Sequence, residues 1–171
     1  MKRHSLLAVT VLALTSVLLT ACGFQLRGST VQDSMPFKTI QIVVPDSSQF
    51  GIELKRNLRG GNSTTIVSDP KDAQVIMEVL GEKKTKVILS LNIQGRAREY
   101  SLIYELRFRV KNNQNKELLP PAIISLRRTL IFSESHALAR ENEEEMLYRD
   151  MQTDLVQQVM RRLVAIKLPA Q

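Results

Sequence analysis

The chain has 171 residues, a formal net charge of +7 at pH 7, 43% apolar residues, no tryptophan and a single cysteine. This apolar content can supply the core of one ordinary domain, and the lone cysteine excludes a disulfide framework within the chain. Stability must therefore come from the packing of mainly aliphatic side chains.

The first segment has the plan of a secretory signal peptide. A basic start precedes an apolar run over residues 6–19, which is shorter than the ~20 residues of a membrane span. The run ends in the sequence LTAC at residues 19–22, the spacing of a bacterial lipobox. We therefore predict a lipoprotein signal peptide over residues 1–21, with a diacylglycerol and an N-acyl chain on Cys22. The alternative is an ordinary signal peptide with an incidental cysteine.

The next segments predict a tether, a strand and a helix. Residues 22–38 read as a lipidated tether, and residues 39–171 as a single domain. The β-branched run over residues 39–44 predicts a strand, and residues 64–67 predict a short edge strand. Between them, Ser47 or Ser48 can cap a helix over residues 49–59, with apolar positions at Ile52, Leu54 and Leu58.

Three longer strands follow. Residues 73–91 are strand-like, with an interruption at Gly81, and residues 92–95 predict a hairpin tip. The clearest strand alternates strictly, with apolar side chains at Tyr100, Leu102, Tyr104, Leu106, Phe108 and Val110 on one face. This period of two predicts an antiparallel strand with one buried face. A polar turn over residues 111–116 leads to a last strand over residues 123–132.

The chain ends in a predicted helix. Asn142 and Glu145 have the spacing of an N-cap and its third-position partner. An apolar stripe at helical spacing follows, made by Leu147, Met151, Leu155, Val159, Leu163 and Ile166. Together the elements predict an α+β fold: a small mixed, mainly antiparallel sheet of four to five strands, with two helices packed on one face. The other face is expected to be exposed and basic.

The charge distribution points to an anionic partner. Between Lys83 and Arg128 there are eleven Lys or Arg and three acidic residues. An exported protein does not normally meet nucleic acid, so we expect a phosphorylated lipid or an acidic protein surface. The alternative is that these charges are only a solvated strand face.

The residues do not favour catalysis. His136 is the one histidine after the signal segment, no thiol remains once Cys22 is acylated, and no His, Cys and acid cluster has metal-ligand spacing. The sequence also lacks a nucleophile-elbow motif. We therefore predict a protein that is not an enzyme, with no catalytic residue, no metal site and no cofactor beyond the covalent lipid.

Three motifs carry a family resemblance. The chain reads CGFQLRG over residues 22–28, has Gly95 and Glu99-Tyr100 around the start of the long strand, and reads ALARENE over residues 137–143. In this combination and order the chain resembles the LPS-assembly lipoprotein family, LptE, over essentially its whole length. The family fold, a small mixed sheet with two helices on one face, agrees with the pattern of elements above.

The resemblance implies a role and a set of binding residues. It implies an outer-membrane lipoprotein, anchored on the periplasmic side, that plugs the LptD β-barrel in a one-to-one complex, assists its assembly and binds lipopolysaccharide in transit. Arg140 matches a basic position of the family before the last helix. At the hairpin tip the family's basic position falls on Ile93, which leaves Arg96 and Arg98 as the nearest substitutes. The alternative function is a pilotin-like or auxiliary lipoprotein of another envelope transport machine.

Overall fold

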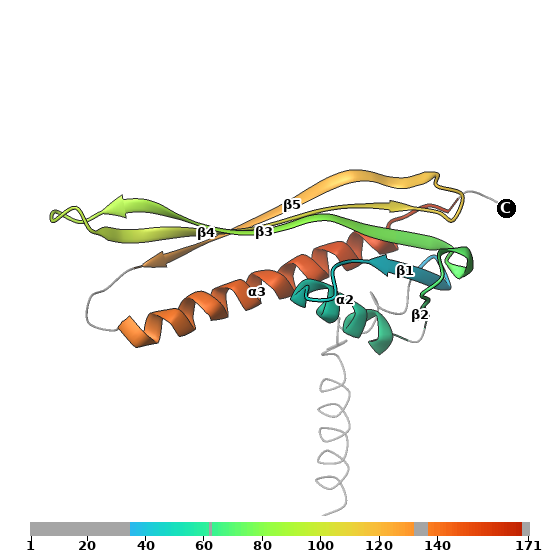
Figure 1. Cartoon of the computed structure of the whole chain (residues 1–171), viewed down its shortest axis with the longest axis horizontal. Coiled ribbons are helices and arrows are strands. Elements are labelled where there is room, and N and C mark those ends of the chain that lie inside the picture. The colour runs from blue at the N-terminus through green and yellow to red at the C-terminus, as the bar shows by residue number, and fades with distance from the viewer. Residues whose placement is uncertain (1–34, 62, 132–136, 169–171) are drawn as a thin grey trace, which may run out of the picture.

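The structure is a computed structural model in which a sheet lies over two helices (Figure 1). It describes residues 35–61, 63–131 and 137–168, apart from the side chains of residues 137–141. In chain order the elements are β1 (Thr39–Val43), α2 (Gln49–Gly60), β2 (Thr65–Ile66), a 3-10 turn (Pro70–Asp72), β3 (Val75–Leu91), β4 (Ala97–Lys111), β5 (Glu117–Ile131) and α3 (Ala137–Val164).

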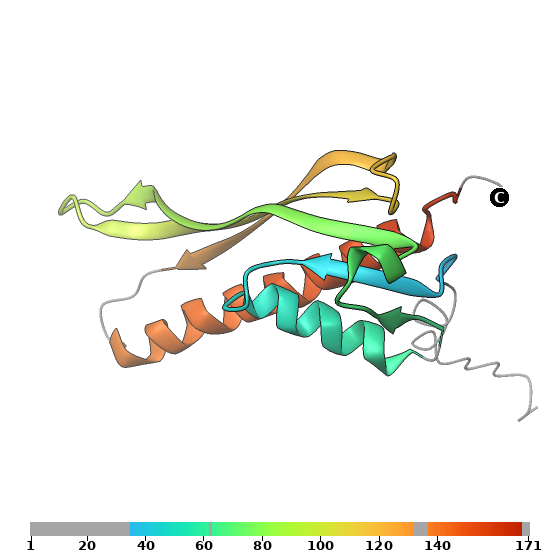
Figure 2. The same cartoon turned by 45° about the vertical axis from the view of Figure 1, so that its right-hand side comes forward.

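The five strands form one mixed sheet in the order β2-β1-β3-β4-β5. β1 pairs in parallel with β2 and β3, whereas β4 is antiparallel to both β3 and β5. Both helices lie on the same face of the sheet (Figures 1 and 2). The predicted α+β class, with a mixed sheet and two helices on one face, is confirmed.

The centre of the core is the inner face of β4. Its alternating side chains Leu102, Tyr104, Leu106, Phe108 and Val110 are fully buried, as the strict period of two predicts. β4 lies between β3 and β5, so its backbone is paired on both sides and its inner face is covered by the helices. Burial of such large side chains is the main stabilising term in a chain without a disulfide.

Helix α2 begins at its predicted cap but buries a different apolar set. The Ser48 hydroxyl accepts a hydrogen bond from the Gly51 N–H at 3.0 Å, which satisfies one of the unpaired amides of the first turn. Phe50, Leu54 and Leu58 are buried, whereas Ile52 is 50% exposed. Residues four apart share one side of a helix, and Ile52 lies on the other side, so this apolar position is not part of the core.

Helix α3 begins earlier than its predicted cap. It starts at Ala137, so Asn142 lies inside the helix and no acidic side chain falls in its first turn. The Ala-Leu-Ala-Arg-Glu run before Asn142 consists of good helix formers, which extend the helix toward the N-terminus. The predicted stripe is confirmed as core: Met151, Leu155, Val159, Leu163 and Ile166 are buried, with Leu147 packed partly against them.

Strand β5 is longer than predicted and contains two prolines. It begins at Glu117 instead of residue 123. Its pairing with β4 jumps from Leu119 opposite Val110 to Ala122 opposite Phe108, which leaves Pro120 and Pro121 at a bulge. Proline has no N–H for a ladder, and edge strands and bulges are where sheets tolerate it.

The predicted interruption at Gly81 is a change of register in β3. The pairing with β4 shifts between Val79 and Gly81. Beyond this bulge β3 no longer pairs with β1, whose last partner is Glu78, and the sheet continues as a three-stranded ribbon of β3, β4 and β5. The ribbon ends in the β3–β4 hairpin, which projects past the start of α3 (Figure 1).

The packed core also includes residues that precede β1. Met35 is 9% exposed and Phe37 is 2% exposed, and both belong to the main apolar cluster. The sequence assigned these residues to a tether over residues 22–38. In the structure the end of that segment is fixed by apolar packing before the first strand begins.

Ser48 is expected to contribute measurably to stability. Besides capping α2, its hydroxyl donates a hydrogen bond of 2.6 Å to the Glu82 carboxylate on β3. Replacement Ser48→Ala removes both contacts and should lower the free energy of unfolding by about 1–2 kcal/mol. Urea unfolding of the full chain followed by circular dichroism measures this. Ser47→Ala is the control, because Ser47 is exposed beside the cap; an equal loss in both variants would contradict the assignment.

Candidate functional site

The structure places two of the predicted binding arginines together at the distal hairpin. Arg96 ends the β3–β4 turn, Arg98 lies in the first residues of β4, and both side chains are exposed. The backbone of Arg140 belongs to α3, at the same end of the molecule (Figure 1), but its side chain lies outside the described residues. Cys22 also lies outside them.

The β3–β4 turn is held by one side chain. The Asn92 carboxamide oxygen accepts hydrogen bonds from the N–H groups of Gln94 at 3.0 Å and Arg96 at 2.9 Å. The Asn92 N–H donates to the Arg96 carbonyl at 2.8 Å, and Gly95 adopts a φ of 74°. A positive φ is unstrained for glycine, so this turn presents the backbone of Arg96 in a defined position.

Two lysines that sequence reasoning missed lie on the helix side of the ribbon. The Lys84 ammonium lies 4.8 Å from the ring centre of Tyr104 and 5.4 Å from that of Tyr148. The Lys86 ammonium lies 4.4 Å from the ring centre of Tyr100 and makes an ion pair of 2.5 Å with Glu144 of α3. Cations over aromatic faces are held by the ring quadrupole, which fixes these lysines between sheet and helix.

The signal for these lysines was their spacing. Lys84 and Lys86 are two residues apart, so they share one face of a strand. The bulge at Gly81 determines whether that face is the helix side or the open side of the sheet. The sequence alone does not show which side chains face the helices beyond a bulge.

A partly buried hydrogen-bonded group joins α2, β3 and β4. The Tyr104 hydroxyl and the Ser48 hydroxyl both donate to the Glu82 carboxylate. Burial, together with the neighbouring carboxylate, raises the pKa of Tyr104 far above its usual range. The phenol therefore stays protonated and acts as a structural donor instead of a general base.

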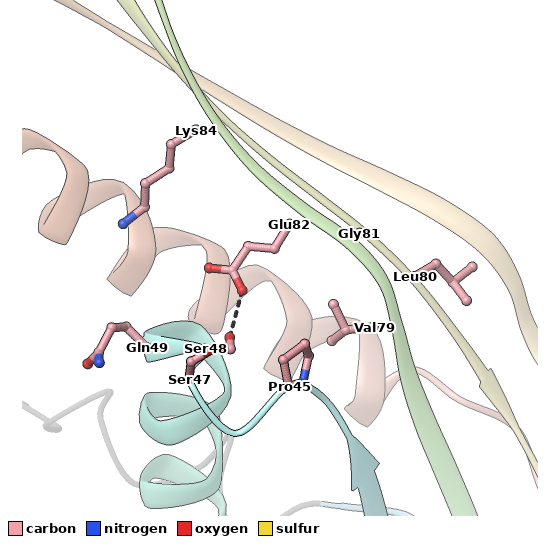
Figure 3. Close-up of a pocket in the computed structure, with 9 residues that line it drawn as sticks. All are labelled: Pro45, Ser47, Ser48, Gln49, Val79, Leu80, Gly81, Glu82 and Lys84. Carbon is pink, nitrogen blue, oxygen red and sulfur yellow. Dashed lines mark hydrogen bonds between the residues drawn. The ribbon is translucent and has the colours of Figure 1, made fainter.

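A cavity of about 540 Å³ lies beside this group (Figure 3). Glu82 and Ser48 are joined by their hydrogen bond at its wall, and Leu80 points to the other side of the strand (Figure 3). The Ser48 hydroxyl is occupied by the helix cap and by Glu82, so it is not poised as a nucleophile. This hollow carries no set of groups for catalysis.

The open face of the sheet stays basic, with a smaller excess than the residue count suggests: it carries Lys83, Arg107, Arg109, Lys111 and Arg127 against Glu78, Glu99 and Glu105. Lys84, Lys86 and Arg128 contact groups of α3 or the tyrosines beneath the sheet, so they are not on the open face. On the open face Glu78 accepts from Arg109 and Lys111, both at 2.6 Å. The hydrogen bond from Lys111 is the largest of the effects that lower the pKa of Glu78.

Ser101 also departs from the expected exposed face. It lies opposite Val87 of β3 and Thr129 of β5, and it is only 1% exposed. Among the described residues, its hydroxyl is the buried side-chain group that lacks a hydrogen-bond partner. A small side chain between two larger neighbours is covered even on an open sheet face.

In the part of the chain that the structure describes, no three His, Cys, Asp or Glu side chains come together in a way that could hold a metal ion. No helix within it combines the length and the apolar character needed to cross a membrane.

Comparison with solved structures supports the fold. An NMR structure of an uncharacterized lipoprotein B from Nitrosomonas europaea is 36% identical and has a TM-score of 0.71, covering 84% of this chain and 91% of that one. The crystal structure of the rare lipoprotein B from Shewanella oneidensis, 24% identical with a TM-score of 0.66, covers 75% of this chain and 95% of that one and shares the fold.

Comparison of sequences identifies the family. The LPS-assembly lipoprotein LptE of Yersinia enterocolitica is 28% identical over 174 aligned residues, which cover 96% of this chain and 78% of that protein. The family model LptE, described as lipopolysaccharide-assembly, matches residues 37–163, from the buried Phe37 to the last turn of α3. The chain therefore belongs to the LptE family.

Proposed function

We propose that this protein is an outer-membrane lipoprotein that binds lipopolysaccharide and plugs the LptD β-barrel, whose assembly it assists. The observation that carries the binding role is the exposed pair Arg96 and Arg98 on the distal hairpin of a chain from a lipopolysaccharide-assembly family. The backbone of Arg140 lies at the same end of the molecule, so we include it in the binding surface.

The chemistry of recognition needs no covalent step. Lipid A carries phosphates, and the arginine guanidinium donates paired, charge-assisted hydrogen bonds to phosphate oxygens. Arginines on a paired hairpin lose less conformational freedom on binding than they would on a flexible loop. Such a surface can compete with the divalent cations that cross-link lipopolysaccharide molecules.

The open sheet face suits a position inside a barrel. Barrel interiors are lined by polar side chains, so a plug needs a surface of alternating charges that can pair with them. The open face offers such a surface, with Glu78, Arg109 and Lys111 joined in one ion-pair group and Glu105 and Arg107 exposed beside it. We propose that this face meets the barrel in a one-to-one complex.

Removal of the arginines should weaken lipopolysaccharide binding. A triple variant, Arg96→Glu, Arg98→Glu and Arg140→Glu, loses up to three charge-assisted contacts, each worth about 1.5–3 kcal/mol when well formed. Affinity for detergent-solubilised lipopolysaccharide, measured by calorimetry, should fall at least tenfold. The circular dichroism spectrum should not change, because the side chains of Arg96 and Arg98 are exposed.

A matched control is present in the chain. Lys116 holds the same place in the β4–β5 turn that Arg96 holds in the β3–β4 turn, since its N–H also bonds an asparagine carboxamide. Lys116→Glu changes the net charge at an equivalent exposed turn and should leave affinity nearly unaltered. Equal losses for Arg96→Glu and Lys116→Glu would show that general charge, and not this hairpin, determines binding.

Contact with the barrel can be trapped in cells. A photocrosslinking side chain at exposed Arg107, on the open face, or at exposed Asn113, in the β4–β5 turn, should give a high-mass product that contains LptD. The same group at exposed Ile52 of α2 serves as the control on the helix side. No product at either test position would contradict the plug and favour the auxiliary role in another transport machine.

Lipidation of Cys22 would account for outer-membrane anchoring on the periplasmic side. The lipobox ends in Cys22, and the following Gly23 lacks the aspartate that favours inner-membrane retention in many Gram-negative bacteria. Several acyl chains, at ~0.8 kcal/mol per buried CH₂, make a stable anchor. Globomycin should make the precursor with residues 1–21 accumulate in intact cells. Processing that continues unchanged under the drug would disprove the assignment.

A further inference from the structure

The β3–β4 hairpin tip exposes a group of large apolar side chains. Ile93 is 98% exposed, Leu91 56%, Ile88 54% and Leu89 51%. Turn residues are usually polar or small, because they lie in water. A contiguous exposed apolar group on a folded domain marks a surface that contacts something apolar.

The second hairpin of the same sheet shows that turn geometry does not require these residues. In the β4–β5 turn the Asn112 carboxamide oxygen accepts from the N–H groups of Gln114 at 3.0 Å and Lys116 at 2.9 Å, as Asn92 does in the β3–β4 turn. Asn115, with a φ of 62°, corresponds to Gly95 with a φ of 74°. The place of Ile93 is taken there by the polar, exposed Asn113.

The apolar side chains lie on both faces of the hairpin. Ile88 is paired with Tyr100, on the face of β4 that packs against the helices, whereas Val87, which is 45% exposed, is paired with Ser101 on the open face. A flat protein partner would cover one face and leave the other exposed. Apolar side chains on both faces and at the tip fit a surrounding medium that is apolar on every side, which is the hydrocarbon of a lipid layer.

Cations lie close behind the tip of the apolar group. Arg96 is level with Asn92, and Arg98 follows the Leu91–Ala97 pair, whereas Ile88 is paired farther back with Tyr100. An apolar tip with cations just behind it is the arrangement by which protein segments enter the acyl region and meet anionic headgroups above it. The charge complementarity therefore selects an anionic lipid layer.

We propose that the β3–β4 hairpin is a wedge that inserts into an anionic lipid layer, with Ile93 and Leu91 among the acyl chains, Arg96 and Arg98 extended to the phosphates, and Ile88 and Leu89 at the boundary behind them. The hairpin projects beyond α3, at the end of the molecule opposite the start of β1 (Figures 1 and 2), so it can enter a layer without the domain. This inference does not require that lipopolysaccharide is the bound ligand.

The absence of tryptophan makes a direct test available. Ile93→Trp places a single indole at the tip, and Asn113→Trp places one at the equivalent position of the other hairpin. Each full-length variant is reconstituted into vesicles with phosphatidylglycerol, with and without brominated acyl chains. We expect a blue-shifted emission and strong quenching by bromine for Ile93→Trp, several-fold above Asn113→Trp, although both chains share the same anchor.

Further arms test the chemistry of the lipid. Adding Arg96→Gln and Arg98→Gln to the Ile93→Trp variant should reduce quenching in anionic vesicles by about tenfold. The Ile93→Trp variant with both arginines retained should give the same low quenching in vesicles of phosphatidylcholine alone. Vesicles with lipid A should behave as those with phosphatidylglycerol. Insertion only with lipid A would overturn the wedge in favour of headgroup-specific recognition.

The outcomes separate this inference from the proposed function. Equal quenching of Ile93→Trp and Asn113→Trp in phosphatidylglycerol vesicles would overturn the wedge, even where lipopolysaccharide binding in detergent is normal. Loss of lipopolysaccharide binding in detergent with intact tip insertion would overturn only the binding role. Quenching that is as strong in phosphatidylcholine as in phosphatidylglycerol would overturn the placement of the cations at anionic headgroups.

Discussion

The structure depends on the unbroken row of large side chains on the inner face of β4. Five of them, from Leu102 to Val110, are fully buried, and no second sheet is present in the described chain to cover them. Two helices must therefore lie against this one face, which explains why the apolar positions of α2 and α3 are aligned with it. In the described chain the opposite face has no covering layer, and it mixes charged side chains such as Glu105 and Arg107 with uncharged ones such as Thr85 and Val87.

The bulge at Gly81 divides the sheet into two regions with different chemistry. Before it, Val75, Met77 and Val79 of β3 face the helices and pack in the core. After it the alternation changes phase, so Glu82, Lys84 and Lys86 face them instead. The first half of α3 is consequently joined to the ribbon by polar contacts, such as the hydrogen bond of 3.1 Å from the Tyr148 hydroxyl to the Thr85 carbonyl. Polar contacts near water contribute less than apolar burial, so the ribbon is the less stable part of the domain.

Several elements could be predicted from the sequence because each depends on local periodicity. The alternation of β4, the cap at Ser48, the hairpin at residues 92–95 and the apolar stripe of α3 are of this kind. The errors have tertiary causes. Asn142 was taken as a cap although helix formers precede it, and β5 crosses two prolines at a bulge. The basic excess of the open face was overestimated, because a residue count cannot follow a change of phase.

The candidate site was partly predictable for the same reason. Arg96 and Arg98 were assigned to a hairpin tip from the turn residues around them, and they lie there with exposed side chains. Lys84 and Lys86 were missed, since their place between sheet and helix follows from the bulge and from Tyr104 and Tyr148, which are distant in the sequence. The exposed Ile93 was noted only as the place where a basic residue was expected, because exposure is not visible in sequence.

The two hairpin turns share one backbone geometry, and the residues that determine it are not the residues exposed at the tips. In each turn one asparagine carboxamide and one residue of positive φ determine the backbone, and the outermost side chain takes no part in either. That residue can accordingly be exchanged, from isoleucine to asparagine or the reverse, at little cost to the strands behind it. The outermost residue of each turn can therefore change while the fold stays the same. Selection or design can alter what each end of the sheet contacts without altering the rest of the domain.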